Sequence, residues 1–98
     1  MTEHAAKVAP DVYKVVFENE NVRMLEARMP VGGHTEMHSH PDYLVYMLQD
    51  GKVKFTTPSG ETAELEVKAG DVMWRDAEEH ATNNIGETEI HALFFEPK

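Results

Sequence analysis

Turn-forming residues divide this sequence into segments that are too short for long helices. Glycine or proline marks a turn at Gly32-Gly33, Asp50-Gly51, Pro58-Ser59-Gly60, Ala69-Gly70-Asp71 and Ile85-Gly86. The stretches between these turns are rich in Val, Phe, Tyr, Trp, Thr and Leu, several of which favour strands. Many short strands at close spacing predict an all-β sandwich or barrel.

The pattern predicts one barrel domain over residues 11–98, preceded by a loose N-terminal arm over residues 1–10. A chain of 98 residues leaves no room for a second domain. Strands are expected at 13–17, 22–29, 36–40, 44–49, 53–57, 62–67, 72–75, 80–83 and 89–96. Asp50-Gly51 predicts a hairpin between 44–49 and 53–57, and Pro58-Ser59-Gly60 predicts the hairpin that follows.

Two predicted strands are apolar without interruption, over residues 44–48 and 92–95. A strand with one solvated face alternates apolar and polar residues, so an unbroken apolar run indicates burial on both faces. We expect the barrel interior on one face and a second subunit on the other. The chain is therefore expected to form a homodimer.

Composition excludes several classes of site and partner. There is no cysteine, so a metal site must use histidine, carboxylate, tyrosine or amide groups. The formal charge of −9 repels nucleic acid and anionic membranes. Residues 1–10 lack the basic start and apolar centre of a signal peptide, and no apolar run approaches transmembrane length. We expect a cytoplasmic protein whose partner is a small-molecule ligand or substrate.

The most informative of the six histidines are the pair in His38-Ser39-His40. Residues i and i+2 of a strand point to the same face, so these two imidazoles would lie side by side. His80 begins a later predicted strand, which a barrel can bring next to the first. Because neutral imidazole is the commonest metal ligand, His38, His40 and His80 are predicted to hold one divalent metal ion.

The residues around these histidines resemble the two sequence motifs of the cupin superfamily. The first motif, G-x5-H-x-H-x3,4-E-x6-G, is matched in part by Gly32, His38, His40 and Gly51; the second, G-x5-P-x-G-x2-H-x3-N, by Gly70, His80 and Asn84. The resemblance implies a cupin-type double-stranded β-helix, that is, a jelly-roll barrel. Among cupins the chain is similar to short single-domain members, including the one named for beta-alanine degradation.

Two departures from the motifs bear on the chemistry. The glutamate of the first motif is replaced by Leu44, or by Val45 if the spacing is taken as one residue longer. The proline and glycine of the second motif are replaced by Asp76 and Glu78, and that segment is one residue short. Three neutral histidines without the glutamate leave a divalent ion with its full charge and with open coordination positions, which favours anionic, bidentate ligands.

Three residues near the motif are candidates to complete the site. Glu36 would share the face of His38 and contact the metal if its strand is regular, and His34 would lie on the same face again. Tyr46 would point into the barrel as a hydrogen-bond donor that orients a substrate or dioxygen. Glu36 and Tyr46 are the predicted catalytic residues, although a solvent-facing glutamate and a core tyrosine are the alternatives.

Two classes of function follow from the three-histidine site. The resemblance to cupin-type thiol and diketone dioxygenases, which hold iron(II) with three histidines, implies an oxidoreductase acting on a small metabolite. The alternative is a non-catalytic module that binds a metal or small molecule in a barrel cavity. Iron, zinc, nickel, manganese and copper all suit three imidazoles, so the identity of the metal stays open.

Overall fold

The computed structural model describes residues 2–98, in which one short helix precedes nine strands. All nine expected strands are present, with ends that differ by a few residues. In chain order the elements are α1 (Ala5–Val8), β1 (Tyr13–Glu18), β2 (Val22–Met29), β3 (His34–His40), β4 (Tyr43–Met47), β5 (Gly51–Thr56), β6 (Thr62–Val67), β7 (Val72–Arg75), β8 (Glu78–Asn84) and β9 (Ile90–Pro97).

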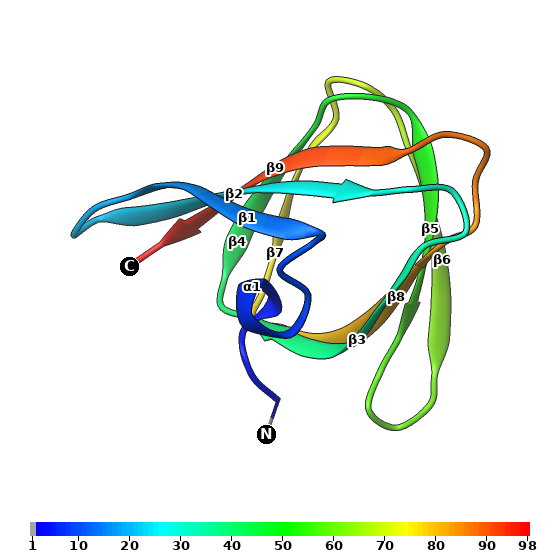
Figure 1. The fold of residues 1–98 in the computed structure, drawn as a ribbon, viewed down its shortest axis with the longest axis horizontal. Coiled ribbons are helices and arrows are strands. Elements are labelled where there is room, and N and C mark those ends of the chain that lie inside the picture. The colour runs from blue at the N-terminus through cyan, green and yellow to red at the C-terminus, as the bar shows by residue number, and fades with distance from the viewer. Residues whose placement is uncertain (1) are drawn as a thin grey trace.

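The strands form two antiparallel sheets that curve around a common interior (Figure 1). The five-stranded sheet has the order β1-β2-β9-β4-β7, and the four-stranded sheet has the order β3-β8-β5-β6. Strands far apart in the chain are therefore neighbours in space, as β2 and β9 or β3 and β8 are. The predicted all-β jelly-roll barrel is confirmed.

One of the two predicted hairpins is wrong. Residues Pro58-Ser59-Gly60 do connect the paired strands β5 and β6, and Gly60 has the positive φ of +91° that such a turn favours. Asp50-Gly51, however, lies where the chain passes from one sheet to the other, because β4 pairs with β7 and β9 while β5 pairs with β6 and β8. Gly51 serves close packing instead, since a Cβ there would meet Ile90 Cδ1 at 2.6 Å.

The core lies between the sheets and follows the alternation of their strands. In β4 the side chains of Tyr43, Val45 and Met47 are buried, whereas Leu44 is half-buried and Tyr46 is exposed. Leu25 from β2 and Ala92 from β9 complete the inward-facing rows. Each fully buried large apolar side chain contributes roughly 1.5–3 kcal/mol to stability.

Residues 2–10 differ from the expected loose arm, because they are packed against β3 (Figure 1). Ala5 in α1 is fully buried, and the backbone N–H of Ser39 donates to the carbonyl of Glu3 at 2.8 Å. His4 caps the helix, since its Nδ1 accepts from the N–H of Ala6, and its Nε2 lies 2.8 Å from Glu96. A buried carboxylate thus anchors the segment, and position 1 lies outside the described residues.

Within residues 2–98, no helix has the length and apolar character needed to cross a membrane.

Candidate metal centre

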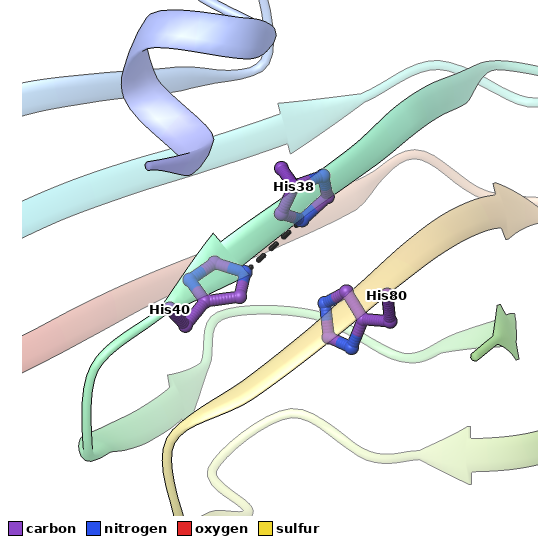
Figure 2. Close-up of side chains that lie close together, drawn as sticks. All are labelled: His38, His40 and His80. Atoms are coloured by element: carbon purple, nitrogen blue, oxygen red, sulfur yellow. Dashed lines mark hydrogen bonds between the residues drawn. The ribbon is translucent and has the colours of Figure 1, made fainter. Parts of the chain in front are cut away.

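Three histidines from two neighbouring strands converge inside the barrel (Figure 2). His38 and His40 are two residues apart on β3, so they share its inward face. His80 lies on β8 directly opposite His38, because the two strands pair in that register. The three side chains are 0%, 3% and 3% exposed, respectively. The predicted triad is therefore brought together by the backbone pairing itself.

The ring nitrogens of the triad are close enough to share one ion. One nitrogen from each histidine lies within 4.8 Å of the others, and the Nε2 atoms of His38 and His40 are 3.1 Å apart. The Nδ1–H of His38 donates to the carbonyl oxygen of Glu36 at 2.8 Å. Since a neutral imidazole carries one proton, this bond leaves the lone pair of His38 on the nitrogen that faces the cluster.

Burial keeps two of these histidines neutral. It lowers the pKa of His38 to about 4 and that of His40 to about 2, and the neighbouring imidazole of His80 adds to both shifts. Among the described residues, Nδ1 of His40 and Nδ1 of His80 are buried without a hydrogen-bond partner. Buried imidazoles with one ring nitrogen each in a common cluster are the donor set that a divalent transition metal requires, so the residues fit such an ion.

The motif glutamate has no substitute on β4. Leu44 lies on the outer side of its strand, and Val45 points inward. The inward position that corresponds to the motif glutamate is therefore Val45, with four residues between it and the motif's second histidine. Neither side chain carries a metal-binding atom. The interior around the histidines is instead lined by aromatic rings, since Tyr43 stacks on His40 with 4.6 Å between ring centroids.

Two predicted catalytic residues are not brought to the histidines. Tyr46 is 40% exposed and lies on the outer face of the five-stranded sheet, because the inward positions of β4 are Tyr43, Val45 and Met47. Glu36 is exposed because the pairing of β3 with β8 shifts between Thr35 and His38. That irregularity buries Thr35 and breaks the alternation that would have placed Glu36 beside His38; only its backbone carbonyl contacts the site.

Two tyrosines that sequence reasoning did not assign to the site line it instead. The hydroxyl of Tyr13, on β1, lies 3.4 Å from Nε2 of His38, and its ring meets the edges of both His38 and His40. Burial raises the pKa of Tyr13 and of Tyr43, so both phenols stay protonated. The inward alternation of Tyr43, Val45 and Met47 was the available signal for Tyr43, whereas Tyr13 reaches the site only through tertiary packing.

A carboxylate also lies behind His80. Glu78 accepts hydrogen bonds from Tyr43 Oη at 2.6 Å and from Arg75 Nε and Nη2 at 2.6 and 2.9 Å. Its Oε1 is 3.3 Å from Nδ1 of His80. Burial alone would raise the pKa of Glu78, but the bonds from Arg75 and Tyr43 and the nearby His80 outweigh it and hold the pKa well below its usual range.

A small cavity adjoins the triad inside the barrel. Its volume is about 60 Å³, and its lining is mostly apolar, with Val45, Met47, Phe94 and His80 among the lining residues. A groove of about 280 Å³ shares Phe55, Arg75 and His80 with this cavity and is also lined by Glu78. The guanidinium of Arg75 lies 4.7 Å above the ring of Phe55. His80 therefore lines both the cavity and the groove.

Comparison with family models finds no match, and comparison with curated protein sequences finds none either. Solved structures do match. A cupin domain from Bordetella pertussis Tohama I is 31% identical with a TM-score of 0.80, and the match covers 89% of this chain and 92% of that one. An RmlC-like cupin from Methanocaldococcus jannaschii, with a double-stranded β-helix fold, is 15% identical with a TM-score of 0.68 over 88% of this chain and 78% of that one.

The matches also include a named enzyme of the same fold. The polyketide cyclase RemF from Streptomyces resistomycificus is 20% identical with a TM-score of 0.62, over 87% of this chain and 63% of that one. At this identity the similarity concerns the fold alone. The sequence resemblance to the cupin named for beta-alanine degradation stays a prediction.

Proposed function

This chain belongs to the cupin superfamily, and we propose that it is a small metal-binding cupin that acts as a metal-dependent enzyme on a small metabolite. His38, His40 and His80 are the residues that would hold the ion, one divalent transition metal. The observation that carries the proposal is the convergence of three buried imidazoles, with ring nitrogens within 4.8 Å of one another.

When bound, such an ion supplies Lewis-acid chemistry and, for iron or copper, dioxygenase-like redox chemistry. The residues around the ion would bind and orient its ligand. Tyr13 places a phenol O–H beside Nε2 of His38, where it can donate to an oxygen atom of a ligand. The cavity is lined mostly by apolar side chains, and its volume of about 60 Å³ suits only a small molecule. Three neutral ligands favour an anionic substrate with two donor atoms.

Elemental analysis of protein purified without a histidine tag tests the metal. We expect about one transition-metal ion per chain in the parent protein, and its loss in His38→Ala. His34→Ala is the matched control, because His34 is an exposed histidine on the same strand. Equal metal content in the His38→Ala variant and the parent would contradict the proposed site.

The alternative is a non-catalytic module that binds a metal or a small molecule. The mostly apolar lining of the cavity favours it. Oxygen uptake by the metal-loaded protein with a panel of 2-oxo acids, diketones and thiols separates the two functions. Uptake that His80→Ala abolishes supports the enzyme, and metal binding without uptake or product formation favours the module.

We also propose that the chain forms a homodimer through the outer face of its five-stranded sheet. One apolar row crosses all five strands, since register pairs Phe17 with Met24, Met24 with Phe95, Phe95 with Leu44 and Leu44 with Trp74. Phe17 and Trp74, at the two ends of this row, are each about half exposed. An apolar row of this extent on the surface is typical of a protein interface, and two copies related by a two-fold axis would cover it.

A further inference from the structure

Glu78 stands where the second cupin motif has glycine, and it was not among the predicted site residues. Its carboxylate is half-buried and lies against three groups: the hydroxyl of Tyr43 and the guanidinium of Arg75, which donate hydrogen bonds to it, and the ring of His80. The two bonds from Arg75 are of the bidentate kind that fixes a carboxylate in one orientation. The oxygen nearest His80 therefore has a defined place.

Glu78 contacts His80 at the ring edge that carries Nδ1, and this edge is turned away from His38 and His40. Nδ1 of His80 lies 3.3 Å from Oε1 of Glu78, while the opposite side of the ring is turned toward His38 and His40 (Figure 2). Within residues 2–98 that Nδ1 has no hydrogen-bond partner, and Oε1 of Glu78 is the carboxylate oxygen within reach of it. A proton on Nδ1 directed at Glu78 would leave the lone pair on Nε2, facing the other ligands.

Glu78 is also placed to orient a ligand rather than to be one. Its carboxylate lies outside the group of atoms that fall within 4.8 Å of one another. Both of its oxygens already accept hydrogen bonds from Arg75. His38 has an equivalent arrangement, in which its Nδ1–H donates to the carbonyl of Glu36. Carboxylates and carbonyls in this position fix the tautomer of a ligating histidine and raise its basicity.

We infer that Glu78 is the positioning residue of His80: held by Arg75 and Tyr43, its carboxylate accepts a hydrogen bond from the Nδ1–H of His80 and so presents Nε2 to the metal. This inference rests on the proposed metal site. It also explains how a chain whose first motif has lost its glutamate at Val45 still provides a negative charge beside the ion. That charge lies behind a ligand instead of in the coordination sphere.

Zinc affinity measured by competition with a chromophoric chelator tests the inference. We expect Glu78→Gln to bind zinc about 10- to 100-fold more weakly than the parent, which is the usual cost of losing such a partner. Glu79→Gln removes the same charge one residue further along β8 and is expected to bind like the parent. Equal affinity of the two variants would overturn the inference while leaving the proposed site intact. Failure of the parent to bind zinc would overturn both.

A second variant separates orientation from charge. Glu78→Gln leaves the positive Arg75 without its partner, which alone would repel a cation. In the double variant Arg75→Gln/Glu78→Gln this charge is absent, so weak binding that persists there supports positioning. Recovery of the parent affinity in the double variant would overturn it.

The tautomer of His80 provides a readout that needs neither metal nor a stable variant. Nitrogen NMR of the metal-free parent, with ¹⁵N-labelled histidine, distinguishes a protonated Nδ1 from a protonated Nε2. We expect His80 to carry its proton on Nδ1, and a proton on Nε2 would overturn the inference even if Glu78→Gln does not fold.

Discussion

His38 and His80 lie directly opposite each other on paired strands, with 5.0 Å between their ring centroids. The register of β3 with β8 thus sets the separation of two ligands, and the two-residue repeat of β3 adds His40. Because strand pairing is held by backbone hydrogen bonds, the cluster is preorganised before any ion binds. A preformed site of this kind loses little conformational entropy on binding.

Metal binding is expected to stabilise the fold. An ion that binds only the native state adds about 2.7 kcal/mol when its concentration is 100 times Kd, which raises Tm by roughly 10 °C or more in a domain of this size. A thermal melt with and without zinc measures the shift. We expect His80→Ala to lose the shift and His34→Ala to keep it; a full shift in His80→Ala would contradict the assignment.

The metal-free protein is expected to lose stability as pH falls below about 6.5. Burial lowers the pKa of His38 to about 4 and of His40 to about 2, so between pH 6.5 and 4 the unfolded chain binds protons that the folded chain does not. Unfolding then becomes easier by about 1.4 kcal/mol per pH unit for each of the two histidines. Urea titrations between pH 7.5 and 5 measure this slope.

We attribute this pH dependence of the unfolding free energy to the buried His38 and His40, and not to the exposed His34. His40→Asn removes one buried titrating group and should reduce the pH dependence, whereas His34→Asn should leave it nearly unchanged. An unaltered slope in His40→Asn would contradict the burial argument.

Restoring the motif glutamate is expected to have opposite effects with and without metal. Val45 points inward, so Val45→Glu buries an unpaired carboxylate and should destabilise the metal-free fold by several kcal/mol. The same carboxylate should tighten zinc binding. Leu44→Glu is the matched control, because Leu44 lies on the outer side of β4. Tighter binding in Leu44→Glu than in Val45→Glu would mean that the β4 register is misassigned.

The homodimer is expected to depend on Trp74, which is half exposed at the edge of the apolar row. Trp74→Glu places a charge in the proposed interface and should yield monomers in light scattering coupled to size exclusion. Thr62→Glu, on the other sheet, adds the same charge and should leave the dimer intact. A parent protein that is monomeric at high concentration would contradict the proposed dimer.

The strands and the three histidines could be predicted from local patterns, because strand propensity, turn residues and the spacing of His38 and His40 depend on neighbouring positions. The crossing at Asp50-Gly51 could not, since β4 and β5 each pair with strands distant in the chain, and those pairings place them in different sheets. Glu36 was misplaced for a related reason: the irregular pairing between Thr35 and His38 changes which residues face inward.

The surroundings of the histidines were the least predictable part of the site. Tyr13 comes from β1, which joins the other sheet, and Arg75 and Tyr43 meet Glu78 only when β4, β7 and β8 are assembled. Glu78 itself was visible only as a departure from the second motif. Of its three partners, His80 lies two residues further along the same strand and Arg75 three residues before Glu78, whereas Tyr43 comes from a strand of the other sheet.

Anomalous diffraction from crystals grown with zinc tests the central claim most directly. The expected result is one strong peak inside the barrel, about 2.0–2.1 Å from one ring nitrogen each of His38, His40 and His80. Peaks only at surface histidines, or an interior without a peak in zinc-saturated crystals, would contradict the account.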